Sequence, residues 1–190
     1  MNSKRWSKGL AIAMSLGVAF LCGTMYSAPT VNILVEGTIP DSRVFGSPVH
    51  VMVRALTIKP GDKLPFHYHP GYAFNVVKSG TLTVEDGCGD LLTLTPGQGF
   101  EETNGRVHRG RNLTDTDVVV YDNFIIPQGK PTTVNLRDDE PRCGPPLDAK
   151  ECENDAWRKF THPQGFTSQK QCLNFIRDRG TGTRFQNPMN

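Results

Sequence analysis

Short runs of apolar residues, separated by turn-forming residues, mark the middle of the chain. Apolar and polar positions alternate in these runs as in a β-strand, and no stretch among them keeps the period of a long helix. The extended runs are Val49–Val53, Ala73–Lys78, Thr81–Glu85, Leu91–Thr95, Arg106–Asn112 and Asp117–Ile126. Many short strands without helices predict an all-β sandwich or barrel, which we assign to residues 29–127.

The pattern changes after the last of these runs. Residues 128–146 are rich in proline, glycine and charge without any period, and we interpret them as a connector that crosses the surface of the barrel. Residues 147–190 form a small separate tail, in which Ser168 and Gln171 have the spacing of a helix capping box. The apolar face of the predicted helix consists of Cys172, Phe175 and Ile176.

The first 28 residues have the pattern of a secretory signal peptide. A basic start is followed by the apolar run Leu10–Leu21 and then by small and polar residues. The apolar run is shorter than a typical membrane-spanning helix. We therefore expect the signal peptide to be cleaved, which gives a secreted or periplasmic protein without a stable membrane span. An uncleaved anchor is the alternative.

Cleavage changes the charge of the chain. The 21 Lys and Arg exceed the 19 Asp and Glu by two, but three of the basic residues lie in the leader and no acidic residue does. The remaining 18 basic and 19 acidic residues give a formal charge of −1. Without a block of Lys and Arg, the mature chain has no electrostatic signature of nucleic-acid binding.

Three histidines carry the most specific chemical signal. His67 and His69 are two residues apart, so an extended segment directs both side chains to the same face, with Tyr68 on the other. His108 lies on a later predicted strand and supplies a third imidazole. Three protein ligands leave at least one coordination position open, as in catalytic rather than structural metal sites.

These residues resemble the two sequence motifs of the cupin superfamily. The first motif has two glycines that enclose a His-x-His pair, here Gly61, His67, His69 and Gly80. The second motif has a proline-glycine turn, a histidine and an asparagine, here Pro96-Gly97, His108 and Asn112. The resemblance covers about residues 49–126 and implies a double-stranded β-helix, or jelly-roll, barrel with the three histidines facing its interior.

The chain departs from the cupin pattern at one ligand position. Ala73, seven residues before Gly80, stands where the first motif has a glutamate. Glu102, six residues before His108, matches a place where some similar cupins carry a glutamate, and it is our candidate for a replacement ligand or a catalytic acid–base residue. The alternative is that Glu101 and Glu102 are solvated residues beside a turn. We expect one divalent transition metal: iron, manganese, zinc, nickel or copper.

The cysteines indicate disulfides. Outside the leader there are four, Cys88, Cys143, Cys152 and Cys172, an even number that is typical of exported proteins. A Cys152–Cys172 bond would hold the small tail together, at about 3 kcal/mol for a loop of that length, and would leave Cys88–Cys143 to tie the connector to the barrel. The other pairings remain open at this point. The cysteines and aromatic residues of the tail also resemble a short tail found in exported bacterial proteins.

Three functions remain compatible with these observations. The first is an exported metal-binding cupin that acts as an enzyme on a small organic molecule, with oxygenase-like or isomerase-like chemistry. The second is a cupin of the same kind that binds a small molecule without catalysis, which the missing glutamate at Ala73 favours. The third is an envelope interaction protein that docks a partner through its aromatic tail. A homodimer is compatible with all three.

Overall fold

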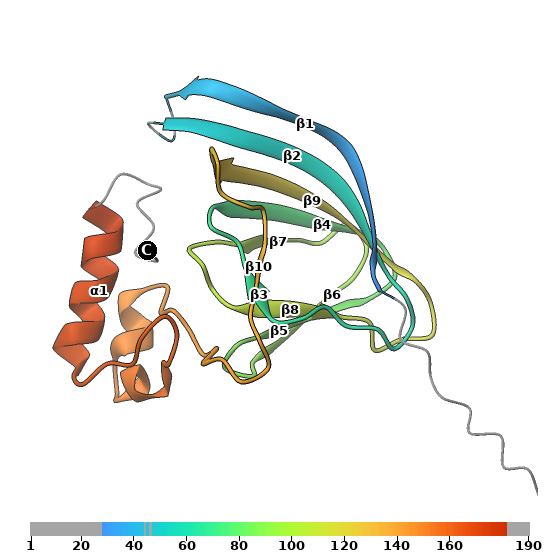
Figure 1. Ribbon diagram of the computed structural model, residues 1–190. Helices are drawn as coiled ribbons and strands as arrows, with labels where there is room; N and C mark the ends of the chain where they lie inside the picture. Colours follow the sequence, from blue (N-terminus) through green and yellow to red (C-terminus); the bar gives the residue numbers. More distant parts are fainter. Residues whose placement is uncertain (1–27, 44, 46, 182–190) are drawn as a thin grey trace, which may run out of the picture.

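The computed structural model describes residues 28–43, 45 and 47–181, and this part of the chain forms two facing antiparallel β-sheets with a small helical tail at one end (Figure 1). The all-β jelly-roll fold expected from the sequence is confirmed. The expected signal peptide, residues 1–28, lies outside the described residues apart from its last position. No helix in the described ranges combines the length and the apolar character needed to cross a membrane.

Each sheet has five strands. In order across the first sheet these are β1 (Thr30–Ser42), β2 (Ser47–Ile58), β9 (Val118–Pro127), β4 (Tyr72–Ser79) and β7 (Gly99–Glu102). In order across the second they are β10 (Val134–Asn135), β3 (His67–Tyr68), β8 (His108–Arg111), β5 (Leu82–Asp86) and β6 (Leu91–Leu94). Strands far apart in the sequence are thus neighbours, which is what brings distant residues to one site.

The main core fills the space between the two sheets. Burial alternates strictly along β9, because successive side chains of a strand point to opposite faces. The buried cluster consists of Leu56, Ile58, Val77, Leu82, Val84, Leu94, Val118 and Val120. A second group, with Ala73, Phe124 and Ile126, continues this core towards the other end of the barrel.

Four strands were not predicted from the sequence: β1, β3, β7 and β10. In β1 the alternation is broken by a bulge between Ile33 and Val35, which moves the apolar positions from one face of the strand to the other. The remaining three have only two to four residues each, too few for a pattern. One of them, β10, lies in the segment that we interpreted as an irregular connector.

The tail consists of two short 3-10 helices, η1 (Ala149–Cys152) and η2 (Ala156–Lys159), and the helix α1 (Gln169–Thr181). Ser168 caps α1, since its hydroxyl accepts from the amide of Gln171 at 3.2 Å. The expected return bond differs: the Gln171 side chain accepts from the amide of Thr167, not from that of Ser168. The tail has its own core, formed by Cys152, Trp157, Phe160, Phe166 and Cys172.

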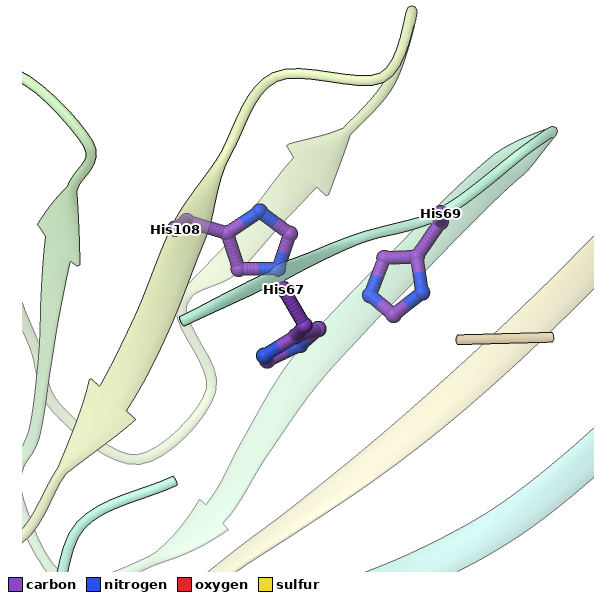
Figure 2. Close-up of side chains that lie close together, drawn as sticks. All are labelled: His67, His69 and His108. Carbon is purple, nitrogen blue, oxygen red and sulfur yellow. The ribbon is translucent and has the colours of Figure 1, made fainter. Parts of the chain in front are cut away.

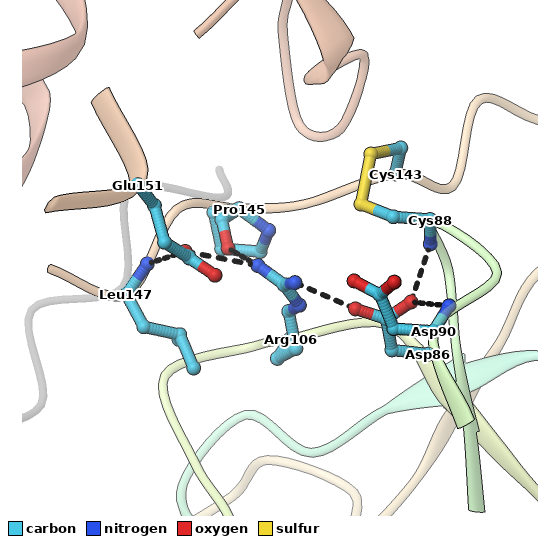
Figure 3. Close-up of a disulfide and its surroundings, with 8 residues drawn as sticks. All are labelled: Asp86, Cys88, Asp90, Arg106, Cys143, Pro145, Leu147 and Glu151. Atoms are coloured by element: carbon cyan, nitrogen blue, oxygen red, sulfur yellow. Dashed lines mark hydrogen bonds and ion pairs between the residues drawn. A yellow bond between two sulfur atoms is a disulfide. The ribbon is translucent and has the colours of Figure 1, made fainter. Parts of the chain in front are cut away.

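Two disulfides connect these parts as expected. Cys152 at the end of η1 is bonded to Cys172 of α1 inside the tail. Cys88, in the turn between β5 and β6, is bonded to Cys143, which follows β10, so this second disulfide joins the barrel to the segment that leads into the tail (Figure 3).

Candidate metal centre

Two strands of the second sheet bring the three predicted histidines together. His67 of β3 lies directly opposite His108 of β8, and His69 follows His67 on the same side of the chain. The ring centroids are 4.4–5.0 Å apart, and the three residues are only 2–4 % exposed. Figure 2 shows the rings turned towards one shared space, with one ligand nitrogen of each within 4.8 Å of the others.

A backbone carbonyl holds each imidazole in place. Nδ1 of His67 lies 2.9 Å from the oxygen of Pro65, Nδ1 of His69 2.6 Å from that of Thr132, and Nδ1 of His108 2.8 Å from that of Arg106. A carbonyl oxygen only accepts, so Nδ1 must donate, and a neutral ring then carries its lone pair on Nε2. This arrangement of outer hydrogen bonds is typical of metal-ligating histidines.

Glu102 of β7 completes the group from the first sheet. Its Oε1 lies 3.0 Å from Nε2 of His108, and its Oε2 lies 3.2 Å from Nε2 of His69. The amide of Asn75 donates to Oε2 at 2.8 Å and fixes the orientation of the carboxylate. Glu102 therefore faces the histidines rather than bulk solvent. Glu101 pairs with Phe74 one position along, and the alternation of side chains directs it to the opposite face.

Burial and the neighbouring charges shift the pKa values of the three histidines in different directions. Burial, and then the nearby His108 and His69, lower the pKa of His67 to about 3. Burial also lowers the pKa of His69, against the opposing effect of Glu102. Burial alone would lower the pKa of His108, but the Glu102 carboxylate outweighs it and raises that pKa. In turn, His108 and His69 overcome burial and hold the pKa of Glu102 well below its usual value.

The donor set fits a transition-metal ion. Nε2 of His108 is fully shielded from solvent and has no well-formed hydrogen bond, although Oε1 of Glu102 lies 3.0 Å away. A buried polar atom without a partner is costly unless something else satisfies it. Three imidazole nitrogens and a carboxylate oxygen are ligands that transition metals accept.

A small cavity opens beside the histidines inside the barrel. Its volume is about 20 Å³, which is room for one or two water molecules. Most of its wall is apolar, with side chains such as Leu56, Val84 and Phe100. Arg54 and Asp122 also line it, joined by a 2.7 Å ion pair between Nε and Oδ2.

Arg54 and Asp122 were not predicted from the sequence as residues of the site. Burial raises the pKa of Asp122 to about 6, although the adjacent Arg54 opposes this shift. The signal was a charged residue at an inward-facing position in each of two largely apolar strands, where it needs a partner. Their pairing depends on the register between β2 and β9, in which Arg54 lies opposite Asp122.

The fold and the site define a jelly-roll barrel with a buried three-histidine group, and comparison with known proteins places this barrel in a family. Residues 55–127 match the family described as "Cupin domain". The match supports the resemblance to the cupin superfamily that the sequence motifs carry.

The solved structures that match the chain are distant in sequence. A cupin domain from Bordetella pertussis Tohama I is 21 % identical, with a TM-score of 0.43, and the match covers 54 % of this chain and 98 % of that one. An uncharacterised conserved protein with a double-stranded β-helix domain from Klebsiella pneumoniae is 17 % identical, with a TM-score of 0.46 and coverages of 70 % and 100 %. A search of curated proteins gives no match to the chain.

Proposed function

We propose that the protein binds one divalent transition-metal ion through Nε2 of His67, His69 and His108, with Glu102 either as the fourth donor or as a general base. One observation carries the proposal: in all three rings Nδ1 is engaged by a backbone carbonyl, which leaves three Nε2 atoms to converge on one buried space. Iron, manganese, zinc, nickel and copper suit such a mixed nitrogen and oxygen set better than calcium or magnesium.

The leading function is catalysis on a small organic molecule. A bound ion with an open position supplies Lewis-acid or redox chemistry. The protein's own contribution is a carboxylate at Glu102 that can hold a proton taken from a bound molecule, kept in one orientation by Asn75. The apolar wall of the cavity excludes bulk water, which strengthens charge interactions at the site.

A second candidate is metal or small-molecule binding without turnover. The size of the cavity favours it, since about 20 Å³ holds water but no organic substrate unless side chains move. Turnover of a small molecule by the metal-loaded protein, lost in Glu102→Gln with the metal retained, supports the enzyme. Tight binding without any conversion supports the second candidate.

The metal itself is tested by the metal content of the protein purified from its own compartment. We expect about one ion per chain, and loss of most of it in His67→Ala, His69→Ala and His108→Ala. His50→Ala is a matched control, because His50 is a partly buried histidine of β2 that pairs with Glu36 at 3.2 Å outside the cluster. Equal metal content in all four variants would rule out the site.

We also propose that the protein works outside the cytoplasm, in the periplasm or the medium. The two disulfides support this, because such bonds persist in oxidising compartments. Fractionation of cells that express the full chain, compared with a chain lacking residues 1–28, tests it. Recovery of the full chain in the cytoplasm with free thiols would contradict the proposal.

A further inference from the structure

The segment just before His108 is held between the two ends of a disulfide. The amide of Val107 donates to the oxygen of Gly144 at 2.9 Å, and the oxygen of Val107 accepts from the amide of Gly87 at 2.7 Å. Gly87 and Gly144 are the direct neighbours of Cys88 and Cys143, whose Cα atoms are 4.2 Å apart in the disulfide. The bond therefore fixes both hydrogen-bond partners of Val107, which is itself completely buried.

The backbone contacts of Val107 with Gly87 and Gly144, which we call the clamp, lie in a tightly packed region. A Cβ atom on Gly87 would come within 1.8 Å of the backbone oxygen of Arg142, so the turn between β5 and β6 lies directly against the segment after β10. Only glycine permits this approach.

Arg106, the residue before Val107, links the barrel to the tail, as Figure 3 shows. Its Nη2 lies 2.6 Å from Oδ2 of Asp86 in the barrel. Its Nη1 donates to the oxygen of Pro145 at 2.8 Å and lies 3.1 Å from Oε2 of Glu151 in the tail. Its guanidinium also lies 5.7 Å from the ring centre of Phe160 in the tail core. With the side chain only 12 % exposed, these are well-shielded contacts between barrel and tail.

The clamp acts on the candidate ligand through one hydrogen bond. The backbone oxygen of Arg106 accepts from Nδ1 of His108 at 2.8 Å, and this bond fixes the direction of Nε2 on the other side of the ring. A shift of residues 106 and 107 would therefore turn the imidazole away from His67 and His69.

We propose that Arg106 and the Cys88–Cys143 disulfide are positioning groups for His108, so that the C-terminal tail is part of the metal site. The inference rests on the proposed metal binding. Loss of an outer partner of a metal-ligating histidine typically lowers metal affinity by about 10–100-fold. We expect a loss of that size in Arg106→Gln and in Cys88→Ser/Cys143→Ser.

The test is a competition titration with Zn²⁺, together with the visible spectrum of the Co²⁺-loaded protein, whose bands report the geometry at the ion. Arg106→Gln should lower Zn²⁺ affinity and change the Co²⁺ spectrum, and Arg106→Lys should restore only part of each. Arg109→Gln is the matched control: Arg109 is also a neighbour of His108 and lies 2.7 Å from Glu85, but its contacts are within the barrel.

The results of these titrations distinguish failure of the proposed metal binding from failure of the positioning role. If the wild-type protein binds no Zn²⁺, the proposed function fails and this inference fails with it. If the wild type binds Zn²⁺ and the Arg106 and Cys88/Cys143 variants bind it equally well, only the positioning role is wrong. An equal loss in Arg109→Gln would show that general loosening is the cause, and would also overturn the inference. If the cysteine variant does not fold, the Arg106 series still decides.

An independent observation concerns the outer face of the first sheet. On β4 and β9, outward positions carry Phe74, Val76, Tyr121 and Ile125, and on β1 they include Val35 and Ile39. Val35, Ile39, Phe74 and Val76 are 39–62 % exposed. In Figure 1 the described helices lie beyond one end of the barrel, and none covers this face. Strands that are apolar on both faces are typical of sheets buried on both sides.

We infer that this face binds a second copy of the chain, sheet against sheet. Five strands at about 4.8 Å spacing and about 30 Å length give a face on the order of 700 Å², close to the roughly 800 Å² per partner of a stable interface. Along β4 and β7 the charged residues of this face are Lys78 and Glu101, of opposite sign, so a two-fold arrangement can bring unlike charges together. A face with so little charge does not fit an anionic lipid surface.

Light scattering of the purified full chain tests the interface. We expect a dimer for the wild type and a monomer for Phe74→Glu and for Val76→Glu, with unchanged metal content. Leu91→Glu is the matched control, since Leu91 is 61 % exposed on β6 of the other sheet and should leave the dimer intact. A monomeric wild type, a dimer that survives both substitutions on β4, or dissociation by Leu91→Glu would each overturn the inference.

Discussion

Glu102 of β7 lies directly opposite Ala73 of β4 in the antiparallel pair that these strands form. Ala73 occupies the position at which the first cupin motif has a glutamate. Side chains at directly opposite positions have Cβ atoms about 5 Å apart, so a carboxylate at either position reaches the same end of the barrel. The acidic group expected of a cupin site is therefore present, but on the neighbouring strand.

Because Ala73 lies opposite Glu102, we predict that a glutamate at position 73 can replace the carboxylate of Glu102 in the site. Glu102→Ala should lose about tenfold or more in Zn²⁺ affinity, within the range for a lost partner at a metal site. Ala73→Glu combined with Glu102→Ala should recover most of the loss, because the new carboxylate enters the same space. Zn²⁺ competition titration measures both. Failure of the double variant to bind better than Glu102→Ala, with the fold intact by circular dichroism, would contradict the prediction.

The metal-free protein should lose stability as the pH falls below 6.5. The pKa of His67 is about 3 in the folded state against an ordinary 6.5, so between these values the unfolded chain takes up a proton that the folded chain refuses. This one group lowers the free energy of unfolding by about 1.4 kcal/mol per pH unit, and the lowered pKa of His69 acts in the same direction.

Glu102 and His108 also contribute to the dependence of stability on pH. Stability from Glu102, whose pKa is lowered from 4.5, is present above that pH and is lost as the pH falls further. His108 acts oppositely, since its raised pKa adds stability below 6.5 that disappears as the pH rises through the folded value. Urea unfolding of the metal-free protein from pH 7 to pH 5 should show a shallower slope in His67→Asn than in the wild type. Parallel slopes would show that His67 does not titrate as described.

Replacing one partner of the Arg54–Asp122 ion pair should lower the free energy of unfolding far more than replacing both partners with apolar residues. Arg54→Leu leaves the Asp122 carboxylate buried without its partner, which typically costs about 3–5 kcal/mol. In that variant burial should raise the pKa of Asp122 above its present value of about 6, so the cost should shrink as the pH falls from 8 to 5. Arg54→Leu/Asp122→Leu should be close to wild type. Urea unfolding at both pH values gives the comparison, and an equally unstable double variant would argue against the ion-pair explanation.

The tail should depend on its own disulfide. The Cys152–Cys172 bond spans a sequence separation of 20 and should be worth about 3 kcal/mol. In Cys152→Ser/Cys172→Ser, hydrogen exchange should become faster in α1 while β4 and β9 keep their protection. Equal acceleration in the sheets would mean that tail and barrel unfold together, against the separate tail domain that the sequence predicts.

The sequence predicted the part of the site that depends on local geometry. The two-residue spacing of His67 and His69 is enough to place them on one face, whatever the strand pairs with. That His108 and Glu102 face the same space followed from the cupin resemblance, and the pairing of His67 with His108 and of Ala73 with Glu102 agrees with it.

Other features depend on contacts between distant segments, and no local pattern identifies the two partners of such a contact. Arg54 and Asp122 are 68 residues apart and meet only through the register of β2 and β9. The clamp on Val107 joins residues near positions 87, 107 and 144, and neither glycine shows its partner in the sequence. In β1 a single inserted residue at the bulge was enough to hide a long strand, because pattern analysis assumes an unbroken alternation.

The three carbonyls that orient the histidines also bear on the order of events during folding. They belong to Pro65 before β3, Arg106 before β8 and Thr132 after β9, so no single hairpin contains the complete set. The site is assembled only when the last of these segments has docked, late in a topology dominated by long-range contacts. If the protein binds a metal as proposed, a nascent or partly folded chain lacks the complete site, and the ion would be selected from the pool of metals present wherever folding is completed.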